Sequence, residues 1–401
     1  MREYMHIGFH SAASRLRSAA SLFTLSLVVG CPKATAEPVD TADVRALKAE
    51  VEAMAFFRDN EYDSRITKGY TLPGLWLQPK LTYNPIESVH LELGAHALIF
   101  DGANKYPCYA YHDVARWKGH QYQRGAHVLP FFRAEARLRH LSVVLGDIYG
   151  ADKHQLLRPM FNPEQTLSAD PEMGFQLLLD RSHIHLDTWL NWQSYIFDED
   201  THQEAFTVGT NATILWSKPH RRIRLSTPVQ FLLQHRGGEQ DTTAMGVQTL
   251  ANASIGLRME TPTRRPTVTN LTAELNLLGS YQQSGHLWPF DTGFAAHAAV
   301  GLTLLSRLTL RADYFESPKQ YANLYGSPFF STLSTKHPGL RFQGMHSATL
   351  GATYVHTFSP AYRLGAEVEA ISAHSPGESD FCFSIGLFLH VRPSVLIKRW
   401  R

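Results

Sequence analysis

The segment Ser88–Phe100, SVHLELGAHALIF, decides the fold class because its two alternating sets of residues differ in polarity. Its odd-numbered positions are all apolar, whereas its even-numbered positions include His90, Glu92 and His96. Successive side chains of a β-strand point to opposite faces, so the segment predicts a strand with one aliphatic and one polar face. A soluble sheet with one wet face fits this pattern, and so does a membrane barrel with a watery lumen.

The same alternation recurs along the chain after Gly74 and favours the barrel. Fifteen segments show it, and many are ten residues or longer, which exceeds the usual strand length of globular sheets. Adding Ala55–Tyr62 gives sixteen strands, an even number as in single-chain bacterial barrels. Short connections alternate with long ones such as Asp101–Ala126 and Glu316–His346. We therefore predict an all-β transmembrane antiparallel β-barrel of about sixteen strands, with fourteen as the alternative, in the outer membrane.

The first 36 residues have the features of an export signal. Arginines precede the short apolar run Leu22–Gly30, and Ala34–Ala36 offers a cleavage site of small residues. A second interpretation is a lipoprotein signal that ends before Cys31, which would then be lipidated. Both interpretations export the protein from the cytoplasm.

The predicted barrel extends over residues 55–392, followed by a periplasmic tail at 393–401. Before the barrel, residues 37–54 are predicted to include a short helix that lies in the periplasm or plugs the lumen. This prediction rests on the spacing of Val44, Leu47, Val51 and Met54, which fall at i, i+3, i+7 and i+10.

Charge excludes one class of partner. The chain has 38 Lys and Arg against 36 Asp and Glu, and removal of the signal leaves it close to neutral. Such a chain lacks the basic surface of a nucleic-acid-binding protein. The expected partners are outer-membrane lipid and, in addition, envelope proteins or further copies of the chain. We predict no cofactor.

Several segments carry a resemblance to a known group of proteins. Phe56–Tyr62 (FFRDNEY), Lys68–Gly74 (KGYTLPG), Leu77–Tyr83 (LQPKLTY) and Gly150–Gln176 resemble a group of outer-membrane β-barrels from Bacteroidota. The resemblance covers about the first half of the mature chain. It implies a barrel in the outer membrane and implies no activity, because the group has none assigned.

Charged residues on the polar strand faces are the candidates for a channel constriction. They are Glu92, Arg133, Glu135, Arg137, Arg139, Arg311 and Asp313. Their mixed signs predict either a transverse field across a constriction or ion-pair networks that make the wall rigid. A separate motif, His183-x-His185-x-Asp187, places three potential metal ligands on one strand face. A metal site needs a further ligand that the sequence does not identify.

The leading functional prediction is a porin-like channel for small polar solutes, because a barrel of sixteen strands is wide enough for an aqueous lumen. The alternative is a structural or assembly subunit with a blocked lumen, and the third is an enzyme that acts on lipid. A lipid hydrolase of this kind needs a serine, a histidine and an orienting group at the lipid-facing rim. The nearest pairs are His346 with Ser347, which point to opposite faces, and Ser372 with His374. Neither is a recognisable catalytic motif, so we predict no catalytic residue and no enzymatic activity.

Overall fold

The computed structural model describes residues 43–100, 125–196, 202–218, 221–238, 246–263, 265 and 267–400. Nearly all regular structure in these ranges is β-strand. The strands are β1 (Ala46–Asp63), β2 (Lys68–Ile86), β3 (Val89–Phe100), β4 (Gly125–Leu138), β5 (Leu141–Asp147), β6 (Met173–Arg181), β7 (Ile184–Ser194), β8 (Ala205–Leu215), β9 (Arg224–Arg236), β10 (Gln248–Pro262), β11 (Val268–Ser284), β12 (Thr292–Leu304), β13 (Leu308–Ser317), β14 (Met345–Ser359), β15 (Tyr362–Ser375), β16 (Glu378–Val391) and β17 (Ser394–Arg399). Short helical segments lie in the connections: η3 (Ala151–His154), α2 (Gln165–Ser168) and η4 (Pro328–Phe330). No helix in these ranges has the length and apolar character that a membrane-spanning helix needs.

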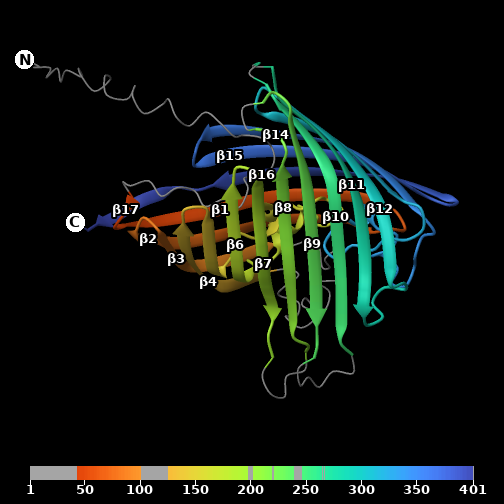
Figure 1. Cartoon of the computed structure of the whole chain (residues 1–401), viewed down its shortest axis with the longest axis horizontal. Coiled ribbons are helices and arrows are strands. Elements are labelled where there is room, and N and C mark those ends of the chain that lie inside the picture. Colours follow the sequence, from red (N-terminus) through yellow and green to blue (C-terminus); the bar gives the residue numbers. More distant parts are fainter. Residues whose placement is uncertain are drawn as a thin grey trace, which may run out of the picture.

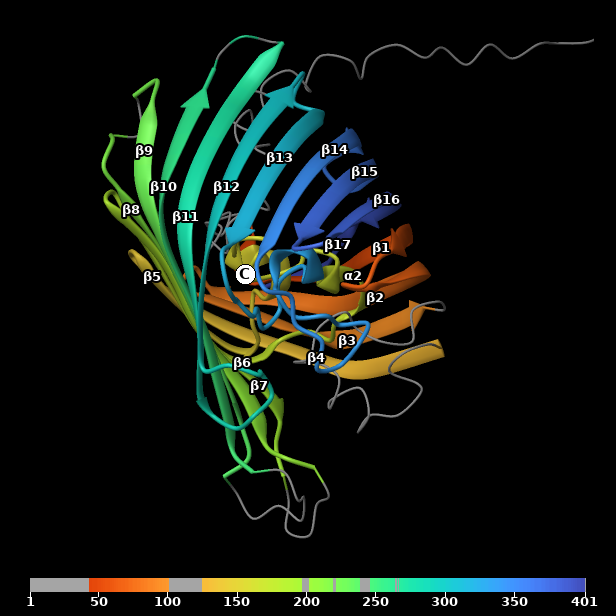
Figure 2. The same ribbon diagram turned by 90° about the vertical axis from the view of Figure 1, so that its right-hand side faces the viewer.

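The first sixteen strands close into an antiparallel barrel (Figures 1 and 2). Each strand pairs with its sequence neighbour, and β16 returns to pair with β1 over Ala53–Glu61 and Phe383–Val391. The predicted fold class is therefore confirmed. The remaining strand, β17, lies antiparallel to the first residues of β1 and extends the barrel wall at the end where the chain begins.

The predicted N-terminal helix is wrong, because its residues belong to a strand. β1 begins at Ala46 and pairs with β2 from Leu47 onward. In the same segment, odd positions from Leu47 to Phe57 are apolar, and the even positions 48, 50 and 52 are Lys48, Glu50 and Glu52. This alternation fits a strand better than the helical spacing does. The barrel thus starts before residue 55, and the predicted tail at 393–401 contains β17. The predicted signal and Cys31 lie outside the described residues.

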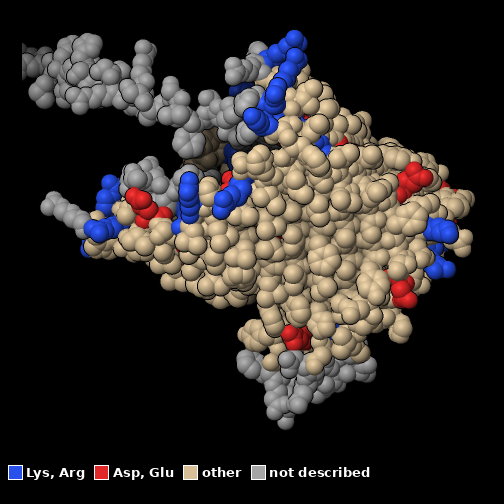
Figure 3. Space-filling view, viewed as in Figure 1, with Lys and Arg blue, Asp and Glu red and all other residues tan. Residues whose placement is uncertain are grey.

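The two faces of the barrel wall differ as the opening segment predicts. Glu92 is 6% exposed and His96 is 4% exposed, whereas Leu93 is 64% exposed. The outer surface is a broad belt with few charged side chains, and charged groups gather toward its edges (Figure 3). Such a belt can face only hydrocarbon, because an unpaired charge in lipid costs several kcal/mol and aliphatic groups cost none. The protein is an outer-membrane β-barrel.

Two long connections fold into the lumen rather than away from the barrel (Figure 2). We call residues 148–172 and 318–344 together the plug. Apolar side chains of the plug, including Met160, Tyr321 and Phe330, are buried in one cluster with inward-facing residues of the wall. Hydrogen bonds also join the plug to the wall. The backbone N–H of Leu157 donates to the side chain of Gln230. The side chain of Asn252 donates to the backbone carbonyl of Ala322 and accepts from the backbone N–H of Leu324. The general rule for bacterial barrels predicts that the end with these long connections is extracellular.

Candidate functional site

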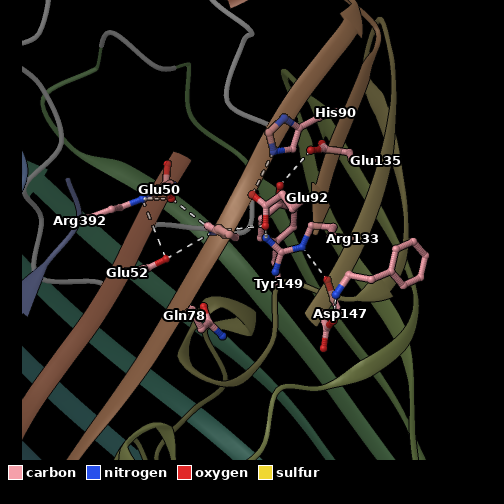
Figure 4. Close-up of polar contacts among 12 residues, drawn as sticks. Glu50, Glu52, Gln78, His90, Glu92, Arg133, Glu135, Asp147, Tyr149 and Arg392 are labelled. Atoms are coloured by element: carbon pink, nitrogen blue, oxygen red, sulfur yellow. Dashed lines mark hydrogen bonds and ion pairs between the residues drawn. The ribbon is translucent and has the colours of Figure 1, made fainter. Parts of the chain in front are cut away.

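Glu92 and Arg133 lie at the centre of an ion-pair network on the inner wall of β1–β4 (Figure 4). Glu92 Oε2 is 3.0 Å from Arg133 Nη1 and 3.3 Å from Lys80 Nζ, and its other oxygen is 3.0 Å from His90 Nε2. Lys80 also lies 3.4 Å from a carboxylate oxygen of Glu50. Each charge has an opposite charge beside it, so these residues form an internal ion-pair network.

The remaining lumen candidates are paired in the same way, with one exception. Arg137 lies 2.8 Å from Glu135, and Arg311 lies 2.7 Å from Asp313. Asp313 also binds the plug, because Nη1 of the plug residue Arg158 lies 3.2 Å from the Asp313 carboxylate. Arg139 is exposed in the turn after β4 and does not join this network. Whether any of these residues borders a conducting constriction stays a prediction.

The predicted metal ligands do not form a metal-binding group in the described part of the chain. His185 pairs with Asp180 at 2.6 Å, and His183 is exposed in the preceding turn. Asp187 instead accepts from His154 of the plug at 2.7 Å. The sequence could not reveal this contact, because His154 and Asp187 lie on different elements.

His154 anchors the plug between two carboxylates. Its Nδ1 lies 2.7 Å from Asp187 and its Nε2 lies 3.2 Å from Glu172, while its ring stacks on Trp189 at 3.5 Å between centroids. Burial alone would lower the pKa of His154, but the carboxylates of Glu172 and Asp187 outweigh burial and raise that pKa to about 9. In turn, burial would raise the pKa of Glu172, and the His154 cation more than compensates and lowers it. This buried cluster attaches the plug to the barrel wall and exposes no reactive group.

A second polar cluster lies on the outer face of the barrel, near the turn that joins β15 and β16. Ser372 Oγ is 2.8 Å from His374 Nε2, and His374 Nδ1 is 2.8 Å from Ser379 Oγ. Both hydrogen bonds are exposed. A neutral imidazole has one donor and one acceptor nitrogen, so it can accept a proton from one serine while the other holds the ring in place. This is the arrangement of a nucleophile, a base and an orienting group.

The hairpin between β15 and β16 produces this geometry. Pro376 and Gly377 form its turn, and Gly377 has a φ of 84°. Proline at the second position and a positive φ at the third fit a type II turn. The turn fixes the register so that Ser379 lies opposite His374. Ser372 and His374 are two residues apart and therefore share the outer face of β15.

Sequence reasoning found two members of this cluster and missed the third. The alternation of the sequence predicts strands at Tyr362–Ser372 and Phe381–Arg392, whereas β15 continues to Ser375 and β16 begins at Glu378. Without the longer hairpin, nothing placed Ser379 beside His374. The Pro376-Gly377 pair, a common turn sequence, could have predicted a tight hairpin here and thus the position of Ser379.

Comparison with known proteins identifies the family. Residues 39–400 match the profile of the family described as "Lipid A 3'-O-deacylase-type". The chain belongs to the lipid A 3'-O-deacylase-type family. Because this family is named for an enzymatic activity, our prediction that the protein is not an enzyme is wrong. That prediction rested on the absence of a recognisable catalytic motif, and Ser379, which completes the outer cluster, lies beside His374 only through the pairing of β15 with β16.

Solved structures with a similar fold have little sequence in common with this deacylase-type chain. OpdL from Pseudomonas aeruginosa is 11% identical with a TM-score of 0.49, and covers 87% of this chain and 99% of its own. OccAB4 from Acinetobacter baumannii is 9% identical with a TM-score of 0.44, and covers 89% of this chain and 100% of its own. The outer membrane protein OprD from Pseudomonas aeruginosa is 11% identical with a TM-score of 0.43, and covers 89% of this chain and 96% of its own. No curated protein matches the chain. The resemblance to Bacteroidota barrels stays a prediction.

Proposed function

We propose that the protein is an outer-membrane serine esterase that removes an ester-linked acyl chain from lipid A, at the 3' position that the family description names. One observation carries the proposal: the Ser372–His374–Ser379 hydrogen-bond chain is exposed on the lipid-facing surface. A soluble hydrolase would keep such a chain in a cleft. Here the substrate is itself part of the surrounding leaflet, so an exposed position is accessible to it.

The chemistry follows from the donor and acceptor arrangement. Ser372 Oγ attacks the acyl carbonyl carbon and passes its proton to His374 Nε2. Collapse of the tetrahedral intermediate breaks the bond to the sugar oxygen, which takes the proton from His374. Water then hydrolyses the acyl–serine ester through the same base, and a fatty acid leaves. Ser379 accepts a hydrogen bond from His374 Nδ1–H and keeps the imidazole oriented.

The surroundings of the cluster suit a glycolipid substrate. Toward the middle of the membrane, the outer face continues with large apolar groups, among them Phe381 at 69% exposure and Leu350 at 64% exposure. These side chains can pack against acyl chains. The ester bonds of a glycolipid lie between its hydrocarbon and its headgroup, which is the depth at which the outer surface changes from apolar to polar.

The test is fatty-acid release from purified lipid A by the purified, folded barrel. Wild type should release an acyl chain, and Ser372→Ala and His374→Ala should each reduce the rate by at least about 1,000-fold, as loss of a nucleophile or base does. Ser375→Ala is the matched control, because Ser375 lies on the same strand and points to the other face; it should retain full activity. If both site variants release fatty acid at the wild-type rate, the proposed function is wrong.

The channel and the structural subunit remain predictions. The plug does not favour an open pore, because its buried residues contact the inner wall on several strands. It is compatible with an esterase, since the proposed site lies on the outside of the barrel and needs no open lumen.

A further inference from the structure

Five successive turns at one end of the barrel each carry an exposed arginine. The plug belongs to the connections after β5 and β13, so the turns β4–β5, β6–β7, β8–β9, β10–β11 and β12–β13 lie at the opposite end, which we call the turn end. Their arginines, which we call the arginine row, are Arg139, Arg181, Arg222, Arg265 and Arg307. Figure 3 shows basic side chains at the edge of the uncharged belt where β8–β11 reach this end.

No carboxylate pairs with this row in the part of the chain that the structure describes. There, none of the five side chains takes part in an ion pair or a hydrogen bond. The exposed carboxylates among the described residues of the turn end are Glu87 and Asp180, and Asp180 already pairs with His185. Successive turns are two strands apart, so neighbouring arginines are about 10 Å from each other. Like charges at about one Debye length still repel, and an anion outside the protein would relieve this repulsion.

Apolar side chains beside the row place it at the edge of the hydrocarbon. Leu138 directly precedes Arg139 and is 61% exposed, and Trp216 at the β8–β9 turn is 70% exposed. Leu305 and Ser306 both have positive φ and form the β12–β13 turn. Such two-residue turns usually contain Asn and Gly, yet Leu305 is 63% exposed here. An exposed leucine in this turn and an exposed tryptophan beside another indicate contact with lipid, as at the boundary between acyl chains and headgroups.

Arginine fits this depth better than other polar residues do. Its aliphatic stem can lie along apolar surface while the guanidinium reaches outward. The guanidinium is weakly hydrated and binds phosphate through two parallel hydrogen bonds. A soluble acidic partner would require basic groups that project clear of the bilayer, whereas this row follows the rim of the lipid-facing surface.

We propose that the arginine row is a binding surface for the phosphate groups of anionic phospholipids in the leaflet that surrounds the turn end. The row covers the side of the barrel from β4 to β13. The surface is separate from the Ser372–His374–Ser379 chain, and the inference does not depend on the esterase activity. Each basic side chain beside an anionic leaflet strengthens association about fivefold.

The experiment measures which lipids contact the folded barrel in vesicles of phosphatidylcholine and phosphatidylglycerol. Spin-labelled versions of the two lipids report the fraction of each that is held at the protein surface. Wild type should prefer phosphatidylglycerol by up to about fivefold. The preference should almost disappear at about 1 M salt, where the Debye length is only about 3 Å.

Variants test whether the row causes this preference. Replacing all five arginines with glutamine should abolish it, whereas replacing all five with lysine should retain most of it because the charge remains. Arg224→Gln is the control, because Arg224 lies two residues after Arg222 and, like Gln230 on the same strand, points into the lumen; it should behave as wild type. Heat-modifiable migration in gels confirms folding. If the variant with five glutamines does not fold, the pairs 139/181 and 265/307 are replaced separately, and each pair should lose part of the preference.

Two results would overturn the proposal. The first is a wild type without lipid preference, or a folded glutamine variant with the wild-type preference. The second is a wild type that binds purified anionic peptidoglycan through the row and is indifferent to phosphatidylglycerol, because the surface would then dock on the cell wall. The measurement involves no turnover of substrate, so either result leaves the proposed esterase function to its own test.

Discussion

Individual positions show how far alternation alone determines a side chain's environment. Glu92 is buried in the wall of the lumen and Leu91 and Leu93 face outward, as the opening segment predicts. The free-energy cost of a carboxylate in hydrocarbon is too high for Glu92 to face lipid. Because side chains alternate along a strand, that one residue also fixes which face its neighbours occupy. What Glu92 contacts could not be predicted, because Lys80 and Arg133 come from two other strands whose register the sequence does not state.

The lipid-facing side of the wall can be tested with one pair of substitutions. Leu387→Arg places a charge on the outer face, where the leucine is 52% exposed. We expect it to lower the free energy of unfolding by about 2–4 kcal/mol if this position lies near the midplane. Thr309→Arg, which points into the lumen, should cost much less. Urea unfolding in lipid vesicles measures both, and equal costs would show that the two faces have been assigned the wrong way round.

The fastening of the plug at His154 should depend on pH. The pKa of His154 is raised from its ordinary value of 6.5 to about 9. The stabilisation from its protonated form is therefore complete below about pH 6.5 and is lost as the pH rises through about 9. Limited proteolysis of the plug should accelerate between pH 7 and pH 10. His154→Gln should remove this increase, and a wild-type plug equally resistant at both pH values would contradict the charged clamp.

At the scale of elements, the sequence predicted most strands but not their ends. Strand ends in this chain carry polar and small residues that interrupt the alternation, as at His374 and Ser379. The wrong helix before residue 55 has a different cause, because four apolar residues there fitted a helical spacing by coincidence although the alternation of a strand was also present. Two of the three members of the outer cluster, Ser372 and His374, were visible in the sequence. Ser379 joins it only through the register of β15 and β16.

The β15–β16 turn should control the activity of the site without contributing a reactive group. Gly377 has a positive φ, so valine there introduces about 1–3 kcal/mol of backbone strain. Gly377→Val should shift Ser379 away from His374 and lower kcat by about tenfold or more. Gly339 has a similar φ of 86° in the plug, with open space around it. Gly339→Val is thus the control, and equal losses of activity in the two variants would argue against a local effect.

For the whole molecule, the position of the site depends on which end of the barrel faces outward. The plug and the β15–β16 hairpin lie at the same end, and the short turn around Pro360 lies at the other. In a Cys108→Ser background, Gly339→Cys should react with a membrane-impermeant thiol reagent in whole cells, whereas Pro360→Cys should not. Labelling at position 360 alone would show that the barrel has the opposite orientation. The hairpin would then lie in the periplasmic leaflet, where the proposed substrate is not displayed.

The central claim is that this barrel deacylates lipid A through Ser372. The most direct test is the mass of lipid A extracted from Gram-negative cells that express either the wild-type protein or Ser372→Ala at equal levels in the outer membrane. We predict that wild type lowers the mass by one ester-linked acyl chain, with fragment ions locating the loss at the 3' position, and that Ser372→Ala leaves the mass unchanged. Identical lipid A from both strains would contradict the claim.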